Sequence, residues 1–419
     1  MHKFIDWLTN KFAPAAQALF AKPYLAAVSG AMTKILPFIL TGSLIYIYQI
    51  FQSFFSHVLP DLSMLLLFSF KMLGLLTAFM VAQQVMEKLD RKNYAIPAGL
   101  TAILVFLVFI NPVFDETQAN VTFSFGRFGP TGMFVALCAG IMVGMVFHFF
   151  AKLNILGKNE TLPDFVKEWV RNILPIFTNI CIATLLVLGL HIDIYQIIVN
   201  LFAPINSFAQ TLPGFMLLSF LQVFFFTLGV SPWVWGAIRN PIFMVAIAAN
   251  AAAVAAGDNP VHIVTYETMF TLGLLTLGGQ GSPLPLVALM LKSKSKKLRQ
   301  FARIVVGPAI FNISEPIMYG LPIVFNPLLM VPMWIISLLG PVLIWIIMKS
   351  GLLTIPSIVL QTGNIPAPFS SWLITQDWRA ILWWCVFFLI YIFIWYPFFK
   401  VFEKKTLEEE SLSLVQNEE

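Results

Sequence analysis

The chain has 419 residues, of which 59% are hydrophobic and only 11% charged, with a net charge of +5 and a mean hydropathy of +0.85. So few charged side chains cannot cover the surface of a water-soluble protein of this size, which excludes the soluble classes. The basic residues lie in short connections beside apolar segments, so they indicate membrane orientation and not nucleic-acid binding. The composition therefore predicts an all-α polytopic membrane protein.

About ten apolar segments are long enough to cross a hydrocarbon core of about 30 Å. They cover residues 25 to 51, 63 to 86, 94 to 114, 130 to 150, 172 to 190, 212 to 230, 232 to 256, 264 to 291, 321 to 348 and 379 to 400. The positive-inside rule assigns the basic connections 87–92, 152–171, 292–303 and 400–405 to the cytoplasm. The connections expected outside contain a single positive charge, Arg127. Both termini are then expected inside.

The polar connection 152–171 divides the chain into two bundles. Its charged residues recur between apolar ones, as in a helix that lies on the cytoplasmic surface. We therefore expect an N-terminal bundle over 1–151, extended by the helix 172–190, and a substrate-binding transport bundle over 212–405. Residues 406–419 are expected to form a cytoplasmic tail.

Two stretches of the second half are rich in Gly and Pro, namely 277–285 and 307–322. An unsatisfied backbone group costs several kcal/mol in hydrocarbon, so irregular backbone survives there only inside protein or beside a water-filled cavity. Each stretch is therefore predicted to form the tip of a re-entrant hairpin, whose free backbone groups are available to a polar ligand.

Glu315 is the first candidate for the functional centre. Between Phe301 and Met348 the only formally charged residues are Arg303 and Glu315. A carboxylate in such surroundings is expensive unless it is paired or faces water or substrate. Pro316 disfavours helical geometry at Glu315, which leaves the carboxylate at the end of a helical segment. The alternative is a structural carboxylate paired with a lysine or arginine near the cytoplasmic face.

A second candidate is the segment 231–241, which combines Trp233, Trp235 and Arg239 with two prolines. Indole faces stack on the apolar faces of sugar rings, so a sugar-binding role is one interpretation. The other is an interfacial tryptophan belt in which Arg239 reaches the headgroups. The sequence leaves both open.

The remaining motifs do not predict a cofactor or a metal. The sequence Gly278-Gly279-Gln280-Gly281 is too short for a dinucleotide fingerprint and lacks the strand that this motif requires. The five histidines are scattered at segment ends or in loops, so metal binding is not expected. The three cysteines each lie alone in an apolar run and predict no disulfide.

Three motifs carry a resemblance to a known family. They are Phe311-Asn312-Ile313-Ser314-Glu315-Pro316-Ile317-Met318-Tyr319-Gly320-Leu321-Pro322-Ile323-Val324-Phe325-Asn326-Pro327, the turn Gly278 to Gly281, and Thr375-Gln376-Asp377-Trp378-Arg379. With these three motifs, the chain resembles the IIC membrane component of the phosphoenolpyruvate-dependent sugar phosphotransferase system, in its lactose/cellobiose/diacetylchitobiose family.

The resemblance implies a homodimeric permease in a bacterial inner membrane. It implies import of a β-linked disaccharide or oligosaccharide by alternating access, with the sugar held by the C-terminal bundle. Glu315 then contacts the sugar hydroxyl that receives phosphate. The phosphoryl donor is a phosphocysteine on a separate cytoplasmic IIB protein, which works with a IIA protein, so the IIC chain is not itself the phosphorylated nucleophile.

One departure from the family concerns Arg239. Family members commonly carry Trp-Phe-Phe-Gly-Ile-His-Gly where this chain reads Trp-Val-Trp-Gly-Ala-Ile-Arg, residues 233–239. A permanently charged guanidinium cannot accept a proton as histidine can. The departure motivates an alternative, an uncoupled or ion-coupled sugar carrier or sensor on the same scaffold. It also motivates the prediction that Arg239 lies within reach of Glu315, since an uncompensated charge there would be costly.

These arguments predict one set of site residues and one docking segment. The predicted substrate-binding residues are Glu315, Asn312, Ser314, Arg239, Asn240, Trp233, Trp235, Gly279, Gln280, Gly281 and Trp372, with Glu315 also expected to act in phosphotransfer. The basic run from Lys292 to Arg299 is expected to be cytoplasmic and close to where IIB docks. A topology signal alone also accounts for those charges.

Overall fold

The computed structural model describes residues 18, 21–54, 59–68, 72–117, 119–129, 131–153, 163–229, 235–321, 323–360, 363 and 365–416. Within these residues, five helices are long and apolar enough to cross a membrane, or six if a bent pair of helices counts as one span. The expected helical chain with several apolar spans is therefore confirmed. The count of ten crossings and the two re-entrant hairpins stay predictions.

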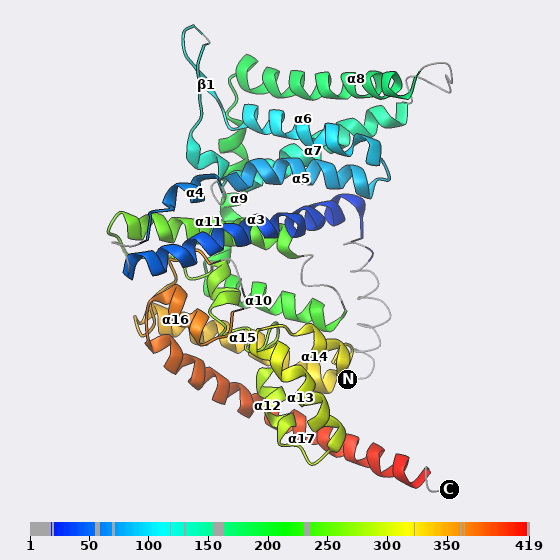
Figure 1. The fold of residues 1–419 in the computed structure, drawn as a ribbon, viewed down its shortest axis with the longest axis vertical. Coiled ribbons are helices and arrows are strands. Elements are labelled where there is room, and N and C mark those ends of the chain that lie inside the picture. Colours follow the sequence, from blue (N-terminus) through cyan, green and yellow to red (C-terminus); the bar gives the residue numbers. More distant parts are fainter. Residues whose placement is uncertain are drawn as a thin grey trace. The chain divides into compact units, whose positions relative to one another are not determined.

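The chain separates into two compact units (Figure 1). We call residues 17–206 with 233–245 the N-terminal unit, and residues 207–232 with 246–419 the C-terminal unit. The helices α9 (Ile194–Ala209) and α11 (Gly236–Ala255) contribute residues to both units. Each unit is described by itself below.

The N-terminal unit is built from long apolar helices that lie side by side (Figure 1). Its elements are α3 (Pro23–Phe54), α4 (Ser63–Phe68), α5 (Leu73–Lys88), η3 (Lys92–Tyr94), α6 (Ala95–Phe109), β1 (Val113–Phe114), β2 (Val121–Thr122), η4 (Phe125–Phe128), α7 (Gly132–Leu153), α8 (Asp164–Thr184) and the π-helical turn η5 (Leu185–Gly189). Helix α5 packs against α3, α6 and α7, and α8 packs against α6 and α7.

Glycines allow the helices of this unit to approach closely. A Cβ atom at Gly144 of α7 would lie 2.5 Å from a methyl carbon of Val85 on α5, and one at Gly140 would lie 2.7 Å from Val81. Lipid tails are as apolar as the helices, so such close packing is what holds membrane helices together. The α5–α7 contact therefore depends on these two glycines.

Two details of this unit differ from the expected elements. Helix α8 runs without a break from Asp164 to Thr184, so the second half of the expected connector 152–171 is continuous with the next apolar segment. Helical geometry continues across the junction because no Gly or Pro lies between Lys167 and Leu174, and the helix also accommodates Pro175. A short antiparallel pair, β1 with β2, also lies between α6 and α7, and its first strand occupies the end of the expected apolar segment 94–114.

The C-terminal unit combines long helices with short ones and irregular backbone. Its elements are α10 (Leu212–Thr227), the second half of α11, the π-helical turn η7 (Glu267–Thr271), α12 (Leu284–Leu291), α13 (Lys296–Ile310), α14 (Glu315–Gly320), α15 (Pro327–Lys349), α16 (Phe369–Thr375) and α17 (Arg379–Gln416). Helix α10 packs along α15, while α17 packs against α12, α15 and α16.

The core of this unit lies along α17, whose Phe387, Tyr391 and Trp395 are fully buried. Buried tyrosine and tryptophan need a partner for their polar atom. The Tyr391 hydroxyl donates to the carbonyl of Leu274 at 2.9 Å, and the Trp395 indole N–H donates to the carbonyl of Ser282 at 3.0 Å. These two bonds anchor both ends of the backbone around the Gly-rich loop to α17. Helix α17 itself continues into the expected tail as far as Gln416.

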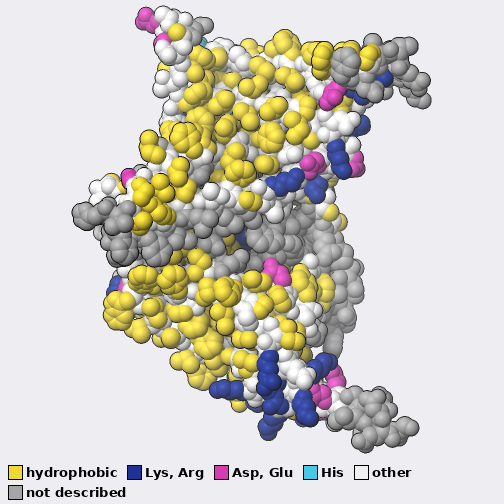
Figure 2. Space-filling model, viewed as in Figure 1, with side chains coloured by type: hydrophobic (Ala, Val, Ile, Leu, Met, Phe, Trp, Pro, Cys, Tyr) yellow, Lys and Arg dark blue, Asp and Glu magenta, His cyan; other side chains and the backbone are white. Residues whose placement is uncertain are grey.

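Charge is distributed unevenly over both units. Figure 2 shows hydrophobic side chains over most of the described surface of each unit, with Lys and Arg gathered at the ends of helices. In the C-terminal unit these side chains include those of Lys292, Lys294, Lys296 and Lys297 at the α12–α13 connection, all exposed. This pattern matches that of apolar flanks in lipid with basic ends in water.

Candidate functional site

The Gly-rich loop between η7 and α12 has a conformation that requires its glycines. Gly278, Gly279 and Gly281 have φ angles of +85°, +101° and +83°. Residues with a Cβ rarely adopt such angles. Ser282 closes the loop, because its hydroxyl donates to the carbonyl of Leu275 at 2.8 Å and accepts from the N–H of Leu277 at 3.2 Å. The loop is therefore tight and fixed by its own backbone.

Asn312 joins this loop to two other segments. Its Oδ1 accepts from the N–H of Gly278 at 3.1 Å, and its Nδ2 donates to the carbonyls of Gly363 at 2.9 Å and Ile365 at 3.3 Å. One amide thus satisfies three backbone groups that an irregular region would otherwise leave unpaired. Asn312 itself has a φ of +58°, which asparagine tolerates better than most residues.

Gly279 lies directly against the segment that carries Ser314. A Cβ atom at Gly279 would lie 2.6 Å from the Cβ of Ser314 and 2.8 Å from the carbonyl oxygen of Asn312. Residues 277–285 and 307–322 therefore meet. Both stretches were singled out in the sequence for broken backbone, and the structure brings Gly279, Asn312 and Ser314 together.

Glu315 is the first residue of α14 and follows the buried Ser314 directly. The Glu315 side chain is partly exposed, and among the described residues it has no ion pair and no side-chain hydrogen bond. The structural alternative, a carboxylate paired with a lysine or arginine, thus finds no partner there. An accessible carboxylate of this kind is available to donors of a ligand, such as hydroxyl groups.

A small cavity lies beside the Gly-rich loop. The amide of Gln280 donates to Oε1 of Gln222 on α10 at 3.2 Å. Both residues line the cavity, together with Ser219, Val223, Met269, Phe270, Leu275, Thr276 and Gly281. The cavity has a volume of only about 10 Å³, which is room for about one water molecule and not for a sugar.

Sequence reasoning missed several residues of this region. Ser219 and Gln222 are three positions apart in the otherwise apolar α10, so they share a helix face, and this spacing was available as a signal. Glu267 is an acid within the predicted span 264–291, so it carried the same signal as Glu315, a carboxylate in apolar surroundings. It is fully buried, and its Oε1 accepts from the N–H of Leu360 at 3.0 Å, which gives it a structural role.

Trp372 lies in α16 of the same unit and is half-buried, with its ring 6.0 Å from that of Phe369. The motif Thr375-Gln376-Asp377-Trp378-Arg379 starts three residues after Trp372. Within this motif, the Asp377 carboxylate pairs with Arg379 at 2.8 Å. Asp377 also accepts from the N–H and the hydroxyl of Thr354. The motif therefore fixes Thr354, in the segment after α15, to the start of α17.

The other predicted site residues belong to the N-terminal unit. Arg239 and Asn240 are buried in the first turns of α11, and Arg239 Nε donates to the side chain of Asn240 at 3.4 Å. A guanidinium that is 6% exposed does not match one that reaches out to headgroups. Trp235 is half-buried, and Trp233 lies outside the described residues. The proximity of Arg239 to Glu315 stays a prediction.

The comparisons with known proteins agree on one family. A family model described as "Phosphotransferase system, EIIC" matches residues 29–337. The chain is 27% identical to the lichenan permease IIC component of Bacillus subtilis, over 99% of this chain and 97% of that protein. It is 26% identical to the cellobiose-specific EIIC component of Geobacillus stearothermophilus, over 98% of this chain and 96% of that one.

A solved structure has the same fold. The crystal structure of the transporter ChbC, the IIC component of an N,N'-diacetylchitobiose-specific phosphotransferase system, superposes with a TM-score of 0.86. The match covers 97% of this chain and 99% of that one, at 22% sequence identity. At this identity, the match establishes the architecture alone.

Proposed function

Because the chain belongs to the EIIC family of the phosphotransferase system, we propose that it is a sugar-transporting IIC permease that imports a β-linked disaccharide or oligosaccharide. The relatives named for lichenan and cellobiose cover nearly its full length, which supports this substrate class. The sugar is expected in the C-terminal unit, and a cytoplasmic IIB protein, phosphorylated through IIA, is expected to phosphorylate it there.

The observation that carries the proposal is the junction of Gly279 with Asn312 and Ser314. It sets the Glu315 carboxylate, which has no partner among the described residues, one residue beyond a fixed, irregular backbone. A rigid backbone beside an accessible carboxylate suits recognition of a sugar hydroxyl, because the O–H of the hydroxyl then donates to a carboxylate that is already in position. Glu315 holds the hydroxyl that receives phosphate, while the phosphoryl group stays on IIB until transfer.

The N-terminal unit is proposed to be the homodimer scaffold, and the C-terminal unit is proposed to move by alternating access. We propose the full set of about ten crossings and two re-entrant hairpins for the membrane-embedded chain, with both termini cytoplasmic. Residues 277–285 and 307–322 are the proposed hairpin tips.

The test uses the full chain reconstituted in proteoliposomes that contain phosphorylated IIB. Labelled cellobiose, lactose and N,N'-diacetylchitobiose are added outside, and the internal product is separated by its charge. We expect one of these sugars to accumulate as a phosphate ester, in an amount that depends on IIB. Uptake of free sugar at the same rate without IIB would contradict the proposal and favour an uncoupled carrier.

A further inference from the structure

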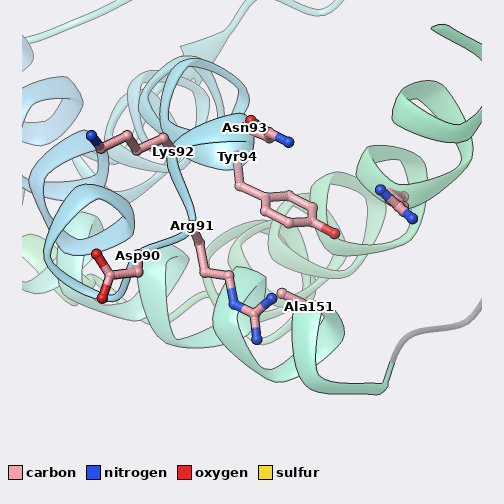
Figure 3. Close-up of a pocket in the computed structure, with 7 residues that line it drawn as sticks. Asp90, Arg91, Lys92, Asn93, Tyr94 and Ala151 are labelled. Carbon is pink, nitrogen blue, oxygen red and sulfur yellow. The ribbon is translucent and has the colours of Figure 1, made fainter. Parts of the chain in front are cut away.

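A basic cavity lies at one end of the N-terminal unit, and none of its lining residues belongs to the proposed sugar site. It has a volume of about 330 Å³ and lies where the loop from Asp90 to Tyr94 joins α5 to α6, with Ala151 of α7 and Arg171 of α8 completing its wall. An adjoining cavity of about 300 Å³ shares Asn93, Tyr94 and Arg171. In Figure 3, Arg91 extends beside Ala151, while Lys92 points away from it.

Two of the three cations that line this cavity, Arg91 and Arg171, have no acidic partner of the kind that other described cations of the unit have. Lys34 pairs with Glu87 at 3.2 Å and Arg127 with Asp193 at 3.1 Å. Among the described residues, Arg91 and Arg171 have no ion pair and no side-chain hydrogen bond. Two guanidinium groups on one cavity form a site for an anion, since each offers several donors in a planar array.

The cavity is also lined by neutral hydrogen-bond donors and by acids. Asn93 supplies an amide, and Tyr94 supplies a hydroxyl on a ring held by an edge contact with Phe147 at 6.2 Å between centroids. Two acids also line the cavities, Asp90 and Glu168. Asp90 lies on the opposite side of Arg91 from Tyr94 in Figure 3, and both acids are exposed, so water screens them.

Rows of exposed apolar side chains run from the cavity along two neighbouring helices. On α6 they are Ile96, Leu100 and Leu104, and on α8 they are Trp169, Ile173 and Phe177, with exposed fractions between 46% and 64%. Residues four apart share one helix face, and α6 packs against α8. The row on α8 begins with tryptophan, the residue that favours the level of lipid headgroups.

We propose that this cavity binds the phosphate of an anionic phospholipid headgroup, with the acyl chains lying along the apolar rows of α6 and α8. A basic pocket between membrane helices, at the end that the charge bias makes cytoplasmic, has the chemistry of an acidic-lipid site. A free phosphate ion would use the guanidinium groups but not the apolar rows.

The experiment measures lipid retention by the full chain. The purified protein is delipidated in detergent and titrated with phosphatidylglycerol, phosphatidylcholine or inorganic phosphate, and bound lipid is counted by native mass spectrometry. We expect phosphatidylglycerol to bind about tenfold more tightly than phosphatidylcholine. Arg91→Gln/Arg171→Gln should remove most of this preference, because it removes both guanidinium groups.

The matched control is Lys88→Gln/Lys152→Gln, which removes the same charge from two exposed residues near that end that do not line the cavity. It should retain phosphatidylglycerol within about twofold of wild type. Equal losses of phosphatidylglycerol binding in the two double variants would overturn the proposal, and so would inorganic phosphate that competes with the lipid at equal concentration.

If the arginine variant fails to fold, a photoactivatable phosphatidylglycerol is bound to the wild-type chain instead. The proposal requires that labelling falls within 90–104 or 167–177, and labelling elsewhere would overturn it.

Discussion

The two units satisfy their backbones in different ways. In the N-terminal unit, long helices pair their own backbone groups, and small residues such as Gly140 and Gly144 let them pack closely. In the C-terminal unit, the backbone between helices is irregular, so side chains must satisfy it. The unit that we propose moves and holds a polar ligand is thus the one whose irregular backbone is held in place by buried polar side chains.

Asn250 illustrates how complete that satisfaction is. Its side chain is fully buried and makes four hydrogen bonds, accepting from the N–H groups of Val261 and His262 and donating to the carbonyls of His262 and Pro356. Asn312 acts in the same way beside the Gly-rich loop. These amides let extended segments cross the interior of the unit without unpaired backbone groups.

The largest effect is expected at Glu315, which does not support the fold. Glu315→Gln keeps the size of the side chain but removes the charge that accepts a sugar hydroxyl. We expect IIB-dependent sugar phosphorylation to fall about 10- to 100-fold, the cost of one charged hydrogen bond, with unchanged thermal stability. Glu409→Gln, an exposed acid of the same unit, is the control and should behave as wild type. Wild-type transport by Glu315→Gln would remove Glu315 from the site.

Asn312→Ala tests the polar support itself. The substitution leaves the N–H of Gly278 and the carbonyls of Gly363 and Ile365 without a partner, so we expect a loss of about 2 to 3 kcal/mol in the free energy of unfolding. Thermal unfolding in detergent measures it. Asn120→Ala, which removes one exposed hydrogen bond to Asp115, should cost under about 0.5 kcal/mol. Equal changes in the two variants would show that Asn312 is not a structural support.

Sequence reasoning succeeded where a single chemical anomaly marked the position. Composition alone predicted the membrane class, and the glycines of 277–285 and the lone acid Glu315 marked two segments that the structure brings together at Gly279 and Ser314. It could not predict which backbone groups Asn250 and Asn312 bind, because those partners are up to 106 residues away along the chain. Helix α8 began earlier than expected because charged first turns and apolar later turns form one continuous helix.

Gly144→Val tests the close helix packing of the N-terminal unit. The new side chain would lie against Val85 where no room exists, and overpacking of this kind costs about 1 to 3 kcal/mol. We expect a lower unfolding temperature and little change in sugar binding by the protein that stays folded. The control is Gly307→Ala on α13, where a Cβ atom would meet nothing within 4 Å. A Gly307→Ala variant as unstable as Gly144→Val would mean that glycine in a helix, and not the α5–α7 contact, sets the cost.

Asp377 makes the stability of the C-terminal unit depend on pH. Burial alone would raise the pKa of this carboxyl, but hydrogen bonds from Arg379 and Thr354 outweigh it and lower the pKa to about 2. The contribution to stability is therefore complete above the unfolded pKa of about 3.9 and is lost as pH falls toward 2. It amounts to about 2 kcal/mol.

Unfolding of wild type and Asp377→Asn between pH 7 and pH 3 measures this term. The variant should be less stable at pH 7 and should show a shallower loss as the pH falls. Asp258→Asn, at an exposed position of the same unit, serves as the control and should follow wild type. Parallel curves for wild type and Asp377→Asn would rule out the Asp377–Arg379 pair as the origin of acid sensitivity.

The smallest effect is expected from the basic run between α12 and α13. Its backbone is held by two acids of α17: Glu403 accepts from Ser293 and from the N–H of Lys294, and Glu410 accepts from Ser295 and from the N–H of Lys297. The lysine side chains themselves are exposed. If they steer IIB, replacing Lys292, Lys294, Lys296 and Lys297 by Gln should slow IIB-dependent phosphorylation about three- to tenfold at low salt, mainly through the association rate.

The location of the run is tested separately, because a topology signal alone also accounts for its charges. Ser295 is fully buried, so a reporter cysteine belongs at the exposed Lys296, in a chain whose Cys138, Cys181 and Cys385 are replaced by Ala. An impermeant thiol reagent should label Lys296→Cys in inverted vesicles and not in intact cells, and labelling in intact cells would refute a cytoplasmic position. If that position holds and the four replacements leave the phosphorylation rate unchanged at every salt concentration, the charges orient the chain in the membrane but do not recruit IIB.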